Sequence, residues 1–271
     1  MPMLATRAGN VAYEEVGSGR PVVLLHANLH DRHDYHPVIE SLARQQRVIS
    51  VDWPSHGESD FVDNVTGPML ADVLEDVVDA LKLKDIVLIG NSVGGSAAAR
   101  LAITRPSLVA GLVLINTGGF VPDTVLTRTF CRVMGTESVT RRVMPRFVRA
   151  YMKAQSPSDD TIVARVTARA RTAEGVRTAA SMWRSFGTPE YDLRDRAHLI
   201  TSPTLIIWGD RDPTLSVRIG RATRRAIPHS TLHEVNTGHV VFSSDPAGFL
   251  QLVEPFLHSL AVPAAKPNSR S

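Results

Sequence analysis

The chain lacks the features that mark secreted, membrane-spanning or nucleic-acid-binding proteins. Among its 271 residues it has one cysteine, Cys131, so no disulfide can form within the chain, as expected in a reducing compartment. Its longest apolar runs fall far short of the roughly 20 residues that a membrane helix needs. The net charge of +3 is too small to indicate nucleic acid or a membrane as partner. The opening MPMLATRAGN has no apolar export segment, so we expect a cytoplasmic protein.

What the chain does contain is enough apolar sequence to bury a sizeable core. Hydrophobic residues make up 43% of it and charged residues 21%. Short runs dominated by Val, Ile and Leu recur along the chain and end in Gly, Asp, Asn or His. Such runs are typical of strands that are buried on both faces, as in parallel sheets. They lie at residues 22–25, 48–51, 86–89, 112–115 and 205–208.

Helices are expected between the strands. Apolar residues at positions 70, 73, 74, 77, 78 and 81 follow the spacing of an amphipathic helix that packs on a sheet. Alternation of strand, helix and strand predicts an α/β fold with a mostly parallel central sheet flanked by helices.

The middle of the chain departs from this alternation. No β-rich run appears between residues 121 and 198, where stretches 141–155 and 161–183 look helical. We therefore predict a core in two parts, 1–120 and 199–260, interrupted by a helical cap at 121–198 and followed by a flexible tail at 261–271. The predicted cap has 14 basic and 8 acidic residues, a net +6, and the remainder has 16 and 19, a net −3.

The strongest chemical signal is a G-x-S-x-G motif, Gly90-Asn91-Ser92-Val93-Gly94, between a predicted strand and an Ala-rich helix. In such an elbow the serine adopts a strained backbone conformation, and small neighbours let the chain turn tightly. The serine oxygen then stands above the sheet at a helix N-terminus, where amides stabilise negative charge. The alternative, a glycine-rich turn with a capping serine, is disfavoured by the strand and the helix on either side.

A nucleophilic serine needs a base, and the base needs an orienting carboxylate. Candidates follow downstream in the order acid, then histidine. Asp210 and Asp212 follow the predicted strand 205–208, and His239 follows a β-like run at 231–235. We favour Asp212 as the acid because it lies deeper in its loop, and we interpret Asp210 as a solvated turn residue.

Two further segments complete a recognisable pattern. Leu24-Leu25-His26-Ala27-Asn28 follows the first predicted strand, and Asp52-Trp53-Pro54-Ser55-His56-Gly57 follows the second. With the serine, aspartate and histidine segments, they make the chain resemble the α/β-hydrolase superfamily from Val11 to Leu257. It is most similar to capped serine hydrolases, including esterases and C–C bond hydrolases of that fold.

The resemblance implies roles for particular residues. Ser92 would be the nucleophile, His239 the general base and then acid, and Asp212 the carboxylate that holds the imidazole. The backbone amides of Asn28 and Val93 would be the oxyanion donors, and residues 121–198 the cap. Asn28 stands where many relatives have a bulky apolar residue, so we expect its side chain to add a polar contact inside the pocket.

Three functions remain open. The first is hydrolysis of an ester-like or activated carbonyl bond of a small molecule. The second is hydrolysis of a C–C bond in an aromatic ring-fission product, because Asn91 precedes the serine as in that subgroup and a basic cap suits a dienoate. The third is ligand binding without turnover. Dehalogenases need a carboxylate at the elbow, which Ser92 disfavours.

No metal or cofactor is expected. His26, His30, His33 and His36, with Asp31 and Asp34 between them, invite a metal site, but their spacing is loop-like and shows no closed ligand set. The chain has no nicotinamide or flavin fingerprint. We expect a small-molecule substrate as the partner and neither nucleic acid nor membrane. The cap arginines are interpreted as a solvated face rather than an anion site, and Trp183 and Phe186 as packing between cap and core.

Overall fold

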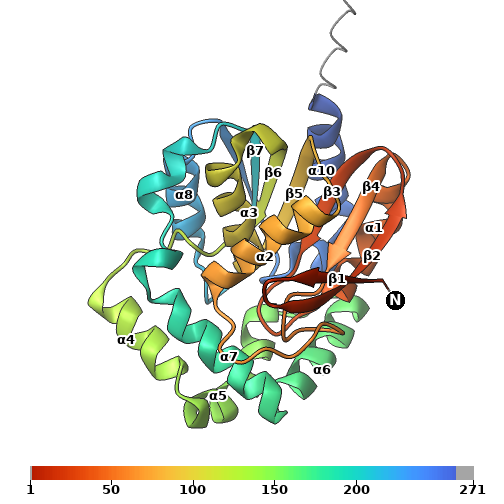
Figure 1. Cartoon of the computed structure of the whole chain (residues 1–271). Helices are drawn as coiled ribbons and strands as arrows, with labels where there is room; N and C mark the ends of the chain where they lie inside the picture. The colour runs from red at the N-terminus through yellow and green to blue at the C-terminus, as the bar shows by residue number, and fades with distance from the viewer. Residues whose placement is uncertain (1, 261–271) are drawn as a thin grey trace, which may run out of the picture.

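The computed structural model describes residues 2–260 and confirms the predicted α/β class. Eight strands form one sheet in the order β1-β2-β4-β3-β5-β6-β7-β8 (Figure 1). The strands β3 to β8 are parallel, whereas β1 and β2 join one edge antiparallel. Their bounds are β1 Met3–Thr6, β2 Gly9–Gly17, β3 Arg20–Leu25, β4 Gln46–Val51, β5 Ile86–Asn91, β6 Val109–Ile115, β7 Thr204–Gly209 and β8 Ser230–Val235.

Helices cover both faces of the sheet and one of its ends (Figure 1). Those of the two faces are α1 His36–Ala43, α2 Gly67–Ala80, α3 Val93–Thr104, α8 Val217–Ala226, α9 Val241–Ser244 and α10 Pro246–Ser259. Those at the end are α4 Val125–Met134, α5 Glu137–Met152, α6 Pro157–Arg169 and α7 Ala173–Phe186, called the cap helices below. No helix within residues 2–260 is both long and apolar enough to cross a membrane.

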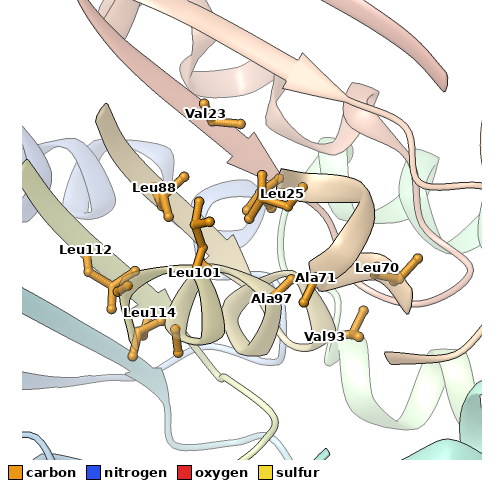
Figure 2. Close-up of a cluster of buried hydrophobic side chains, with 14 of the residues drawn as sticks. Val23, Leu25, Leu70, Ala71, Leu88, Val93, Ala97, Leu101, Leu112 and Leu114 are labelled. Carbon is orange, nitrogen blue, oxygen red and sulfur yellow. The ribbon is translucent and has the colours of Figure 1, made fainter. Parts of the chain in front are cut away.

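Two apolar cores lie on the two faces because successive residues of a strand point to opposite sides. Val23 and Leu25 of β3 pack with α2 and α3, as Figure 2 shows, whereas Val22 and Leu24 pack on the side of α1 and α10. This arrangement explains why the strands contain continuous Val/Ile/Leu runs instead of alternating ones.

The helix predicted from the spacing at 70–81 is present as α2. Thr66 caps its N-terminus, and the side-chain oxygen of Thr66 accepts a hydrogen bond from the Met69 amide at 3.2 Å. Leu70, Val73 and Leu74 are fully buried, in agreement with the predicted apolar stripe.

Two parts of the chain differ from the prediction. The hairpin of β1 and β2 was not predicted because most of its residues lie at an exposed edge and carry no continuous apolar run. The helix expected at 161–183 is two helices, because Thr172 accepts a hydrogen bond from the Gly175 amide and thereby starts α7. The tail at 261–271 lies outside the described residues.

Candidate active site

Ser92 stands on a sharp turn between β5 and α3. Its backbone lies at φ 56° and ψ −117°, a conformation that L-residues rarely adopt. A Cβ on Gly90 would lie 2.5 Å from the Gly94 carbonyl, and one on Gly94 would collide with the Leu25 carbonyl oxygen. Both glycines are therefore required by close backbone approach, and together they expose the serine above the carboxyl end of β5.

Asp212 and His239 meet at the same end of the sheet. Asp212 follows β7 and His239 follows β8, and these neighbouring strands are parallel, so their carboxyl ends lie side by side. The Nδ1–H of His239 donates to Asp212 Oδ2 at 2.6 Å, and both side chains are buried. Asp210 is exposed. A histidine held in this way can serve as a general base.

A group of donors surrounds the Asp212 carboxylate. Asn116 donates from Nδ2 at 2.9 Å, and Thr214 donates from its amide at 2.8 Å and its hydroxyl at 2.7 Å. Burial raises the pKa of Asp212, but His239 and the hydrogen bonds from Thr214 outweigh it and hold that pKa below its usual value. Asn116 was missed from the sequence. The only signal was its place directly after the strand at 112–115.

Ser92 and His239 line one cavity of about 490 Å³. The residue before the serine links their two loops, because Asn91 Nδ2 donates to the His239 carbonyl at 3.0 Å and to the Ile115 carbonyl at 3.0 Å. This contact fixes the backbone of the histidine loop against the serine elbow. The volume fits a small-molecule ligand.

The two expected oxyanion donors come from different segments of the chain. Asn28 follows β3 and lines the cavity. Val93 is the first residue of α3, and its side chain packs into the apolar core (Figure 2). The first amides of a helix have no partner within the helix, so the Val93 amide can receive negative charge on a ligand.

The side chain of Asn28, for which a polar contact in the pocket was expected, also contacts a buried histidine. Its amide lies 3.3 Å from Nε2 of His56. Burial lowers the pKa of His56 well below the usual value, so the ring is neutral, and its Nδ1–H donates to the Pro54 carbonyl at 2.8 Å. Nε2 is then an acceptor, so a hydrogen bond with Asn28 requires the side-chain amide to be turned so that its nitrogen faces Nε2 in place of Oδ1.

The cavity wall contains six aromatic residues, five of them on the cap helices. Trp183 and Phe186 line the cavity and also pack against the apolar cores, which is the role expected of them. Among the described lining residues there is no lysine or arginine, and the carboxylates are those of Asp123 and Asp192. The aromatic lining residues are Phe130, Phe147, Tyr151, Trp183, Phe186 and Tyr191.

A second buried pair of an imidazole and a carboxylate contacts the Tyr151 hydroxyl. His30 Nδ1 contacts Asp34, and His30 Nε2 lies 2.9 Å from the Tyr151 hydroxyl. The Tyr151 ring meets the His239 ring edge-on, with 5.2 Å between the ring centroids. The backbone carbonyl of Tyr151 accepts a hydrogen bond from the His239 amide at 3.1 Å. Burial raises the pKa of Asp34, but His30 and Arg165 outweigh it and lower that pKa. The sequence did not signal this network.

Three of the histidines considered for a metal site, His26, His30 and His33, form hydrogen bonds, and Nε2 of the fourth, His36, lies 3.8 Å from Glu14. His26 Nδ1 contacts the Ala27 carbonyl at 2.7 Å, and His33 Nδ1 contacts Asp31 at 3.0 Å. Over residues 2–260, no group of three or more His, Cys, Asp or Glu side chains is arranged to hold a metal ion.

Comparison with known proteins adds the family context. A family model described as the alpha/beta hydrolase fold matches residues 20–246. A 2-hydroxy-6-oxononadienedioate/2-hydroxy-6-oxononatrienedioate hydrolase of Cupriavidus pinatubonensis is 31% identical, over 80% of this chain and 78% of the relative. A 2-hydroxy-6-oxo-2,4-heptadienoate hydrolase of Pseudomonas putida is 30% identical, over 90% and 91% of the two chains.

Solved structures share the architecture. A thermophilic esterase from Thermogutta terrifontis matches with a TM-score of 0.81 at 24% identity, over 96% of this chain and 99% of the esterase. At this identity the likeness establishes the fold alone.

Proposed function

The chain belongs to the α/β-hydrolase family, and from that premise we propose that it is a serine hydrolase acting on esters of small, uncharged acids. The observation that carries the proposal is the buried contact of 2.6 Å between His239 Nδ1 and Asp212, at a cavity that Ser92 also lines. The cap helices would close this cavity over the substrate.

The proposed reaction follows from the positions of these groups. His239 takes the proton of the Ser92 hydroxyl as its oxygen attacks the ester carbonyl, and Asp212 stabilises the imidazolium that forms. The backbone amides of Asn28 and Val93 receive the oxyanion, and each such donor is worth about 3 to 4 kcal/mol. His239 then protonates the leaving alcohol, and water releases the acid from the serine by the same route.

Cys131 also lines the cavity, and a cysteine thiolate is a strong nucleophile. Burial raises the pKa of its thiol to about 11, so it stays protonated at neutral pH. Since the thiolate is the reactive form, Cys131 is a poor competitor of Ser92.

The charge of the wall supports an uncharged acyl group. A carboxylate that enters the cavity loses hydration, and no arginine or lysine among the described lining residues compensates for it. Asp123 and Asp192 also line the cavity, and each is already paired with an arginine, at 3.4 Å and 2.6 Å. The aromatic side chains favour an apolar acyl or aryl group instead.

C–C bond hydrolysis is the second candidate, supported by the two relatives at 30% and 31% identity. Those relatives are named for substrates that carry carboxylates. In this chain the amide nitrogen of Asn91 donates to backbone carbonyls of Ile115 and His239, which accounts for an asparagine at this position without such a substrate.

The test compares p-nitrophenyl butyrate with the p-nitrophenyl half-ester of succinic acid, which adds one carboxylate. We expect the butyrate ester to be hydrolysed with kcat/KM higher by about tenfold or more. Ser92→Ala should lower the rate by about three orders of magnitude or more.

Other results point elsewhere. Faster turnover of the half-ester, or of a 2-hydroxy-6-oxo-dienoate, would replace the proposal with the second candidate. Labelling of Ser92 by a fluorophosphonate without turnover of any substrate would indicate a ligand-binding protein.

A further inference from the structure

The helix α4 exposes a concentration of large apolar side chains. Leu126 is 80% exposed, Val125 73%, Val133 49% and Phe130 46%. These four lie on one helix of 10 residues. The other exposed large apolar residues of the described chain are scattered singly, at Met3, Val16 and Leu199. Scattered cases are ordinary, whereas a cluster marks an interaction site.

The spacing gives α4 two neighbouring stripes, which are offset by one residue and so lie about 100° apart around the helix. Thr127, Cys131 and Met134 form an i, i+4, i+7 stripe, of which Cys131 and Met134 are buried. Leu126, Phe130 and Val133 form a second stripe with the same spacing on the exposed side. The first stripe accounts for the packing of the helix. The second, called the α4 stripe below, is largely exposed, although its Phe130 also meets the Trp183 ring edge-on at 5.4 Å between centroids.

Positive charge is concentrated on the helix that carries the α4 stripe and on the helix that follows it. Together α4 and the helix that follows it, α5, contain six arginines and one acidic residue, Glu137. Only Arg128 among the six forms an ion pair within residues 2–260, with Asp123 at 3.4 Å. The other five are exposed to solvent, at Arg132, Arg141, Arg142, Arg146 and Arg149.

The exposed apolar side chains and the arginines together indicate what binds to the stripe. A second copy of the chain related by a two-fold axis would bring the same arginines together, and their repulsion opposes that pairing. A lipid surface with anionic headgroups offers an apolar interior for the stripe and negative charge for the arginines. We propose that the α4 stripe and the arginines of α4 and α5 form a docking surface for anionic membranes.

The docking surface adjoins the cavity. Thr127, Phe130 and Cys131 of the same helix line it, so docking would place the cavity beside apolar molecules in the lipid layer. The net charge of the whole chain predicted no membrane partner. The proposal departs from that prediction because the positive charge is concentrated at residues 121–198, which include 14 basic and 8 acidic residues.

The test is co-sedimentation of the full chain with vesicles of phosphatidylcholine, with and without about 30 mol% phosphatidylglycerol. We expect binding only to the anionic vesicles, weakened by about tenfold when salt is raised from about 0.1 to 0.5 M. The double variant Leu126→Glu/Val133→Glu should lower binding by about tenfold or more. Leu199→Glu, an exposed leucine elsewhere, is the matched control and should bind as the unaltered chain does.

Neither Leu126 nor Val133 lines the cavity, so the double variant should keep its circular dichroism and its hydrolysis of a soluble short ester. Because binding is measured without hydrolysis, the result is independent of the proposed function. The proposal is overturned by absence of binding at low salt, or by binding that the double variant retains. It is also overturned by a concentration-dependent dimer that the double variant abolishes, because a second copy would then cover the stripe.

Discussion

The side chain of Asn116 connects two loops on which the proposed chemistry depends. It accepts from the Gly209 amide at 2.8 Å and donates to Asp212 at 2.9 Å. Asn116→Ala removes both bonds and leaves buried polar groups without a partner, which costs about 1 to 3 kcal/mol of stability. We expect kcat for the ester to fall by about tenfold with little change in KM, because Asp212 loses one of the donors that hold it. An unchanged kcat in steady-state assays would contradict this role.

Tyr151 is expected to position His239 from the other side. Tyr151→Phe keeps the ring against His239 but removes the hydroxyl that His30 holds at 2.9 Å. We expect kcat to fall by about threefold to tenfold, and the free energy of unfolding by about 1 kcal/mol.

The matched control is Tyr191→Phe, which removes a buried hydroxyl that accepts from Ser96 at 3.1 Å. It should lower stability to a similar degree and leave the pH profile of kcat/KM unchanged. Equal effects of both variants on kcat and on that profile would show that Tyr151 contributes only to packing.

The sequence indicated the candidate site residues that lie in local motifs and gave no signal for the residues that contact them. Ser92, Asp212 and His239 each follow a strand with a recognisable pattern, and strand ends meet at one edge of the sheet. Asn116 has only its place at a strand end. Tyr151 and the pair of His30 and Asp34 are brought together across 121 residues by the docking of α5, which no local pattern encodes.

At the level of elements, the turn between β5 and α3 depends on close backbone approach. Gly94→Ala would drive a Cβ into the Leu25 carbonyl oxygen, so α3 must move away from β3. We expect a loss of about 2 kcal/mol or more of stability, measured by urea unfolding, together with loss of esterase activity. Gly187→Ala is the control, since its Cβ would come no closer to any atom than 3.2 Å, the distance to the Cys131 side chain. Equal destabilisation by both variants would argue against a tight elbow.

Helices and strands were predictable where their burial produces a regular pattern of apolar residues in the sequence. The central strands are buried on both faces and appear as continuous apolar runs, and α2 has one buried face and a clear period. The hairpin of β1 and β2 is exposed at an edge and shows neither signal. The start of α7 depends on a single capping threonine, Thr172, within a stretch that otherwise favours helix throughout.

For the whole molecule, buried titratable groups predict lower stability in acid. Burial lowers the pKa of His26 and of His56, and pairing lowers the pKa of Asp34 and of Asp212 despite their burial. The unfolded chain takes up protons on these groups at about pH 6.5 for histidine and about 3.9 for aspartate, before the folded chain does. Stability is therefore full above about pH 7, declines first as unfolded histidines are protonated, and declines again below about pH 4.

The measurement is the midpoint of urea unfolding at about pH 7.5, 5.5 and 3.5. We expect it to fall at each step, and we expect His56→Asn to reduce the first fall. A midpoint that is constant or higher at the middle pH would contradict the neutral state assigned to the buried rings.

The central claim is that the Ser92 oxygen becomes covalently acylated during turnover. Quenching the reaction with p-nitrophenyl butyrate in acid, followed by peptide mass spectrometry, tests it most directly. The account predicts a butyryl group on Ser92 of the unaltered chain and none on that peptide in His239→Ala. Steady hydrolysis of the ester without acyl-Ser92, or hydrolysis that persists in Ser92→Ala, would contradict it.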